Sequence, residues 1–161
     1  MLNTSKDFIY MDYAATTQVR PEVLDSMLPY LRDIYGNPSS IYSIAQESRK
    51  AVDESRDTIA EILGCRSGEI IFTSGGTESD NLAIRGVAEA MAPAKRRHLI
   101  ASSIEHEAVL NTFKALAKHG WTTSLLPVDT RGVVDPDALE DALTDDTAIV
   151  SVMHVNNEIG T

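Results

Sequence analysis

The sequence predicts an α/β fold, with a mostly parallel sheet and flanking helices. Short apolar runs, which are typical of buried strands, alternate with longer segments whose apolar residues recur every three or four positions, as in amphipathic helices. The expected strands cover residues 69–72, 98–101, 122–126 and 147–153. Polar clusters follow three of these strands, at residues 74–77, 102–106 and 154–158. Because ligands of parallel sheets bind beyond the carboxyl ends of the strands, these clusters are expected to converge on one edge.

The first two expected helices precede the strands. One has Pro21 in its first turn, where the missing N–H costs nothing, and Gly36 ends it. Its predicted buried face consists of Leu24, Met27, Leu28, Leu31 and Tyr35. The other is expected to be capped by Ser39 or Ser40 and to end at Gly64, a typical C-terminal glycine. Its predicted core side consists of Ile44, Ala51, Val52, Ile59, Ile62 and Leu63.

The remaining helices lie between the strands. The helix that follows residue 77 is expected to carry Leu82, Ala83, Val87 and Ala90 on one face. Residues 108–119 form the next helix, and its predicted inward residues are Val109, Leu110, Phe113, Leu116 and Ala117. A short helix is expected to be capped by Asp135, to begin at Pro136 and to end at Leu143.

Composition limits the classes of function. The chain has 161 residues, enough for a sizeable core, and a net charge of −10. Residues 95–97 form its one cluster of Lys and Arg, which argues against nucleic acid as a partner. No apolar segment approaches transmembrane length and the start lacks a signal-like apolar core, so no membrane partner is expected. The single cysteine, Cys65, excludes an intrachain disulfide and favours a cytoplasmic location.

The segment FTSGGTESDN at residues 72–81 has the chemistry of a phosphate cradle. Its glycines lie where a strand is expected to turn into a helix, and free backbone N–H groups at a helix start attract anions. Gly75 and Gly76 allow close approach, while Thr77 and Ser79 add hydroxyl groups. Neither a P-loop lysine nor G-x-G-x-x-G spacing is present. Taken alone, the segment is equally compatible with a plain turn in which Thr77 or Ser74 only caps the helix.

The whole chain resembles the amino-terminal half of the cysteine desulfurases, pyridoxal-phosphate enzymes of the class V aminotransferase group. The resemblance rests on YMDYAATT at 10–17, GNPSS at 36–40, the segment 72–81, EHEAV at 105–109 and MHVNNEIG at 153–160. It implies the large domain of the aspartate-aminotransferase-like fold of pyridoxal-phosphate transferases (fold type I). Residues 1–16 would be an arm of the small domain, and 17–161 the first half of the large domain.

The resemblance also implies roles for particular residues. Gly76 and Thr77 would bind the cofactor phosphate, and His106 would stack on the pyridine ring and shuttle protons in catalysis. Asn157 would contact the phenolic oxygen of the ring and orient the substrate, and Asn37 would lie on the substrate side. Without the motifs, His106 is more simply an exposed loop histidine and Asn157 a turn residue.

Other candidate residues receive no site role. No set of side chains has metal-ligand spacing, and His98, His119 and His154 are expected to be structural or exposed. Cys65 is not assigned the persulfide role, because the persulfide-forming cysteine of the resembled family lies in its carboxy-terminal half.

The implied parent reaction converts L-cysteine to L-alanine and passes sulfur to a protein cysteine, for iron–sulfur cluster or tRNA thiolation pathways. The implied partners are a sulfur-acceptor or scaffold protein and a second copy of the enzyme. None of the lysines lies in the family's Ser-x-His-Lys motif, so this chain, as a fragment or truncated product, is expected to be inactive alone and prone to aggregate. The alternatives are a selenocysteine lyase, another class V aminotransferase, or a non-catalytic binding or dimerisation module.

Overall fold

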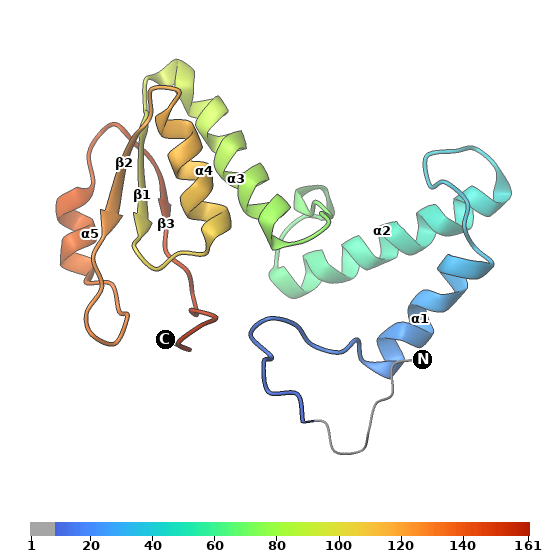
Figure 1. Ribbon diagram of the computed structural model, residues 1–161. Coiled ribbons are helices and arrows are strands. Elements are labelled where there is room, and N and C mark those ends of the chain that lie inside the picture. Colours follow the sequence, from blue (N-terminus) through green and yellow to red (C-terminus); the bar gives the residue numbers. More distant parts are fainter. Residues whose placement is uncertain (1–8) are drawn as a thin grey trace. The chain divides into compact units, whose positions relative to one another are not determined.

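The computed structural model describes residues 9–161, which form two compact units. One unit ends at Phe72 and the other comprises Thr73–Thr161 (Figure 1). The assignment of residues 1–16 to a small-domain arm stays a prediction, and its first eight residues lie outside the described part of the chain. No described helix combines the length and the hydropathy needed to cross a membrane.

The first unit is helical. It contains α1 (Pro21–Arg32), α2 (Ser43–Leu63) and a short 3₁₀ helix, η1 (Ser67–Glu69). Pro21 occupies the first turn of α1, as predicted. The predicted C-terminal glycine of α2 is also confirmed: Gly64 has φ +67°, and its N–H donates to the carbonyls of Ala60 and Glu61. Both features depend on residues within one helical turn, which is why the sequence alone predicts them.

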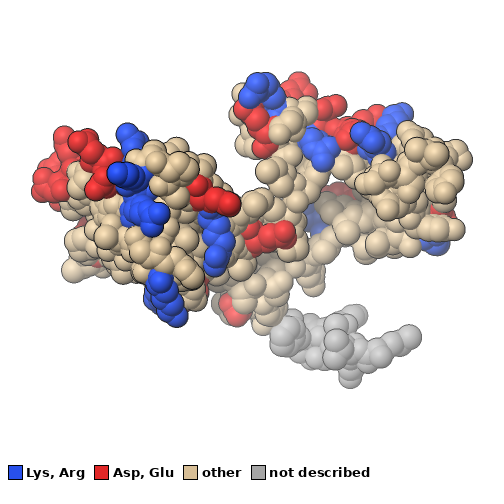
Figure 2. Space-filling view, turned by 90° about the horizontal axis from the view of Figure 1, so that it is seen from above, with Lys and Arg blue, Asp and Glu red and all other residues tan. Residues whose placement is uncertain are grey.

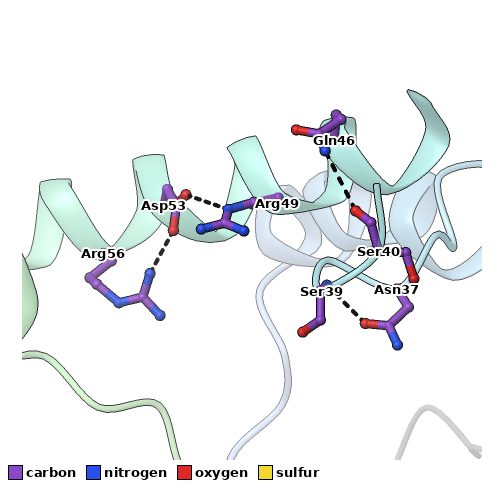
Figure 3. Close-up of polar contacts among 7 residues, drawn as sticks. All are labelled: Asn37, Ser39, Ser40, Gln46, Arg49, Asp53 and Arg56. Carbon is purple, nitrogen blue, oxygen red and sulfur yellow. Dashed lines mark hydrogen bonds and ion pairs between the residues drawn. The ribbon is translucent and has the colours of Figure 1, made fainter. Parts of the chain in front are cut away.

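The predicted start of α2 was wrong. Its N-cap residue is Tyr42, and no side chain caps it. Ser39 and Ser40 instead belong to a separate turn: the Ser39 N–H donates to Asn37 Oδ1 at 2.9 Å (Figure 3). The Ser40 N–H donates to the Asn37 carbonyl at 2.9 Å. The asparagine side chain thus satisfies the backbone locally and delays the helix by several residues.

The predicted buried faces of α1 and α2 were wrong in part: Ala51, Val52 and Ile59 of α2 are half-buried, but Ile62, Leu63 and the predicted face of α1 are exposed. α1 has no buried residue, and α2 buries only Ala45, Ser48 and Ala60. Leu31 is 70% exposed and Ile62 is 77% exposed. Periodicity identifies which side of a helix is apolar, but burial also needs an opposing surface, and packing within the described residues leaves most of these side chains exposed.

The second unit has the predicted α/β architecture. Its sheet, counted within the described residues, has three parallel strands in the order β2 (Thr122–Leu126), β1 (His98–Ser102) and β3 (Thr147–Ser151). Its helices are α3 (Gly76–Met91), η2 (Ala92–Ala94), α4 (Glu107–Ala117) and α5 (Pro136–Ala142). α3 and α4 lie together on one side of the sheet and α5 lies against β2 on the other (Figure 1).

The core of this unit lies between the sheet and the α3–α4 layer. The central strand β1 is buried along its whole length. The core cluster comprises Ile84, Ala88, Leu99, Ala101, Val109, Phe113 and Trp121. The predicted inward positions of Val109 and Phe113 in α4 are confirmed. The predicted face of α3 was wrong, because this helix buries Ile84 and Ala88 and leaves Leu82 48% exposed. The two buried positions are one turn apart and define a different face from the predicted one.

The expected strand at 69–72 does not form. Glu69 ends the 3₁₀ helix, and residues 70–72 pair with no strand within the described part of the chain. Ile70 has extended dihedrals, φ −89° and ψ 123°, but Ile71 and Phe72 are exposed. An extended segment becomes a strand only when a neighbour accepts and donates its backbone hydrogen bonds.

Candidate functional site

The start of α3 is free of side-chain caps. Its N-cap residue, Gly75, carries no side chain, and the helix begins at Gly76. Neither Ser74 nor Thr77 caps the helix with its side chain, so the interpretation of this segment as a simple cap was wrong. Ser74 donates rather than accepts, with both its N–H (2.7 Å) and its hydroxyl (2.6 Å) bound to the Glu78 carboxylate. The first amides of α3 therefore remain available to an anion.

The two hydroxyl groups predicted to line the cradle differ. The hydroxyl of Thr77 makes no hydrogen bond with any described residue. That of Ser79 lies 2.6 Å from the Thr73 hydroxyl and 3.2 Å from the Gly75 carbonyl. Ser79 therefore holds the turn together, and Thr77 is the hydroxyl free to bind a ligand.

Glu78 brings a negative charge to this turn. The hydroxyl and the backbone N–H of Ser74 hold the pKa of the Glu78 carboxyl below its ordinary value, because both stabilise the ionised form. The carboxylate therefore accepts two hydrogen bonds from Ser74, the residue before the N-cap of α3.

Thr77 and His106 line the same hollow, between the starts of α3 and α4. Its volume is about 340 Å³, and its lining also includes Asn81, Arg85, Asn111 and Thr112. The structure thus brings together the predicted phosphate-binding threonine and the predicted ring-stacking histidine.

The imidazole of His106 is oriented by the helix that follows it. His106 is the N-cap residue of α4, and its Nδ1 accepts a hydrogen bond from the Ala108 N–H at 3.0 Å. In the neutral ring an accepting Nδ1 assigns the proton to Nε2. Any proton exchange with a bound molecule therefore involves Nε2.

Asn81 lines the hollow and connects α3 to α4, a role that the sequence analysis missed. Its Nδ2 donates to the Thr77 carbonyl at 2.9 Å, and its Oδ1 accepts from the Thr112 hydroxyl (2.8 Å) and from Arg85 Nε (3.2 Å). The contact of Asn81 with Thr77 was predictable, because residues four apart are neighbours on a helix. The contact with Thr112 was not, because Thr112 lies in another helix.

Asn157 does not line this hollow. It is exposed, and its Nδ2 donates to the carboxylate of Glu158 at 3.2 Å. It follows β3, which pairs in parallel with β1, so its loop and the loop of His106 leave the same edge of the sheet. The loops are in contact, because Asn156 Nδ2 donates to the Ile104 carbonyl at 3.0 Å.

Glu105 was named only as part of a motif, and the structure gives it a distinct position. It is a buried carboxylate, 8% exposed, between the ends of β1 and β3. The Ser102 hydroxyl donates to it at 2.8 Å, and so do the Met153 N–H and the Ser151 hydroxyl. The Ser-x-x-Glu spacing was a signal for the Ser102 contact, but nothing in the sequence identified the partners from β3.

Asn37 belongs to the unit that ends at Phe72, and its contact with substrate stays a prediction. Its side chain closes the turn before α2, and Asp53 makes ion pairs with Arg49 and Arg56 further along that helix (Figure 3).

The remaining histidines have no place in the hollow. His98 is buried and structural, with its ring nitrogens 3.0 Å from Thr147 Oγ1 and 2.8 Å from Ser124 Oγ. His119 and His154 are exposed. Within residues 9–161, no group of three His, Cys, Asp or Glu side chains could hold a metal ion. On the face drawn in Figure 2, basic and acidic side chains form small groups of both signs.

Comparison with known proteins gives consistent matches. The model of the family described as aminotransferase class-V matches residues 9–161. The cysteine desulfurase IscS of Dictyoglomus turgidum is 53% identical over 153 residues, which are 95% of this chain and 39% of the relative. That of Methanosarcina thermophila is 51% identical over 160 residues, 99% of this chain and 39% of the relative. The chain thus spans about 39% of the length of these curated relatives.

Solved structures show the same likeness. A NifS-like protein superposes with a TM-score of 0.91 at 42% identity, over 95% of this chain and 42% of that protein. A structure described as SspA in complex with cysteine gives a TM-score of 0.87 at 41% identity, over 92% of this chain and 43% of that one.

Proposed function

Since the chain belongs to the aminotransferase class-V family, we propose that it contributes part of the pyridoxal-phosphate site of a cysteine desulfurase. The observation that carries this proposal is the shared hollow of Thr77 and His106 at the start of α3. The cysteine desulfurases among the relatives and the cysteine complex of SspA support the substrate class.

The donors of the hollow suit the cofactor. A phosphate ester needs N–H and O–H donors without competing partners, and the uncapped start of α3 and the hydroxyl of Thr77 supply them. A flat aromatic ring needs a flat group against its face, and His106, whose imidazole is flat, lines the same hollow.

When bound, pyridoxal phosphate supplies an electron sink for negative charge that develops on the amino-acid substrate. In this proposal Gly76 and Thr77 hold its phosphate, the first through its N–H and the second also through its hydroxyl. His106 would lie against its ring and would exchange a proton through Nε2, because Nδ1 accepts from the Ala108 N–H. Asn157 contacts the phenolic oxygen after its side chain leaves Glu158, and Asn37 lies on the substrate side.

The reaction of the whole protein is proposed as conversion of L-cysteine to L-alanine, with sulfur passed to a protein cysteine and on to an acceptor or scaffold. We further propose that it acts as a cytoplasmic homodimer in iron–sulfur cluster assembly or tRNA thiolation. None of the lysines, Lys6, Lys50, Lys95, Lys114 and Lys118, lies in a Ser-x-His-Lys motif. The 161-residue chain is therefore expected to bind the cofactor without a specific covalent link and without turnover.

Binding can be tested with pyridoxamine 5′-phosphate, which lacks the aldehyde and so does not react with surface lysines. Titration of the ¹⁵N-labelled chain is expected to shift the amide signals of Gly76 and Thr77, whereas pyridoxamine without phosphate should leave them unchanged. Thr77→Val removes the free hydroxyl but preserves the side-chain shape, and should weaken binding by about tenfold.

The matched control is Thr123→Val, the same substitution at an exposed threonine of β2 that does not line the hollow. This variant is expected to bind like the unmodified chain. Equal affinity for the phosphorylated and unphosphorylated compounds, or equal binding by Thr77→Val, would refute the proposed phosphate site.

A further inference from the structure

The buried carboxylate of Glu105 has no part in the site as proposed, yet its surroundings are unusual. A glutamate that is 8% exposed loses most of its hydration and needs hydrogen-bond donors in return. No Lys or Arg is paired with it in the described residues. Its donors are instead two hydroxyl groups and one backbone N–H.

These donors come from two different strand ends. Ser102 is the last residue of β1, three residues before Glu105 itself. Ser151 is the last residue of β3, and Met153 lies two residues beyond it. One carboxylate therefore joins the loop that leaves β1 to the loop that leaves β3, across 46 and 48 residues of sequence.

Each joined loop carries one residue of the proposed ring contacts. His106 follows Glu105 directly, and Asn157 lies four residues after Met153. A second bond, from Asn156 Nδ2 to the Ile104 carbonyl, spans the same pair of loops. Hydrogen bonds made by residues next to His106 and close to Asn157 thus hold the two loops together. His106 and Asn157 themselves have no direct hydrogen bond to each other.

We propose that Glu105 is a positioning residue whose carboxylate sets the separation between the His106 loop and the Asn157 loop. The link to cofactor rests on the function proposed above, while the link between the loops does not. Without the carboxylate, the Met153 N–H and the two hydroxyl groups lose their buried acceptor, and only the Asn156–Ile104 hydrogen bond still joins the two loops.

The experiment uses the full 161-residue chain, ¹⁵N-labelled, and compares Glu105→Ala with Glu105→Gln. Glu105→Ala is expected to speed hydrogen exchange of the Met153 amide by about tenfold and to shift the His106 ring and Asn157 side-chain signals. Its dissociation constant for pyridoxamine 5′-phosphate should rise by about tenfold. Glu105→Gln keeps one acceptor oxygen, so both values should stay within about threefold of the unmodified chain.

The matched control is His98→Gln, which alters a buried polar residue at the start of β1, whereas Glu105 is bound to Ser102 at the end of β1. It is expected to leave the Met153 amide, the two site signals and cofactor affinity unchanged. If Glu105→Ala does not fold, Glu105→Asp replaces it, because the side chain is one methylene shorter and should no longer reach Met153.

Unchanged Met153 exchange in the variants that remove or shorten the carboxylate would overturn the proposal, as would equal effects from His98→Gln. If the unmodified chain does not bind pyridoxamine 5′-phosphate, the proposed function fails. Met153 exchange and the site signals then still decide whether Glu105 holds the loops together.

Discussion

At the scale of single residues, two glutamates near the proposed site have opposite surroundings. Glu78 is exposed and bonds within its own turn, to Ser74 four residues earlier. Glu105 is buried and bonds to donors 46 and 48 residues away as well as to Ser102. The first is an arrangement of neighbours in sequence. The second exists only because β1 and β3 pair side by side.

The Glu78 carboxyl offers a test of the turn that precedes α3. Its pKa is lowered first by the Ser74 hydroxyl and then by the Ser74 N–H, so Ser74→Ala should raise this pKa part of the way toward its ordinary value. The hydroxyl's contribution to stability is present above the ordinary glutamate pKa, and is lost as pH falls through the lowered folded-state value. A ¹³C NMR titration of the Glu78 carboxyl measures the shift, and an unchanged pKa in the variant would show that the Ser74 contact is absent in solution.

At the scale of elements, caps and turns follow from their local residues. Gly64 ends α2 in a left-handed conformation and Asp135 caps α5, its side chain accepting from the Asp137 N–H at 3.0 Å. Both were predicted. The late start of α2 was not, because the turn at Asn37 competes with helix formation, and propensity alone does not decide that competition.

The passage from α1 to α2 depends on Gly36. A Cβ at this position would lie 2.6 Å from the Ile44 carbonyl oxygen and 2.7 Å from the Ala45 nitrogen. Both are backbone atoms, which can move only if the helix moves with them. Gly36→Ala is therefore expected to displace the first turn of α2 and to lower stability by about 1–3 kcal/mol. Chemical denaturation followed by helical circular dichroism measures the loss.

Gly68→Ala is the matched control for this prediction. A Cβ at Gly68 would meet no atom within 4 Å, and its φ is not positive. Stability within about 0.5 kcal/mol of the unmodified chain is expected for this exposed position. If the two substitutions have equal effects, the close approach at Gly36 does not limit the packing of α2.

At the scale of the whole molecule, many large apolar side chains remain exposed. Ile41 is 87% exposed, Ile62 is 77% exposed and Ile71 is 68% exposed. Apolar surface of this extent favours association, since burying it between molecules removes it from water. This surface agrees with the predicted tendency of the isolated chain to aggregate.

Ile62→Lys offers a direct test of that tendency. The substitution places a charge on an exposed apolar face of α2 and should reduce concentration-dependent light scattering, because it disfavours association while leaving the buried residues unchanged. Phe113→Ala, in the core of the second unit, should instead increase scattering, because it costs about 3–5 kcal/mol and unfolds that unit. A sharp, concentration-independent thermal transition of the unmodified chain would contradict the prediction.

The sequence by itself determined the family, the α/β class, the extents of β1 and β2 to within a residue, and the caps at Gly64 and Asp135. These features depend on the periodicity of apolar residues, on residues within one turn, and on motifs that occur in the same order as in the family. The family and the class are confirmed by the aminotransferase class-V match and by the solved structures.

Only the tertiary structure decided which apolar faces are covered, whether residues 70–72 form a strand, and which donors surround Glu105. Each of these depends on a surface or a backbone supplied by a distant part of the chain, and local sequence carries no record of that partner. The same reason separates Thr77 and His106, which the fold brings into one hollow, from Asn157, which it leaves on the adjoining loop.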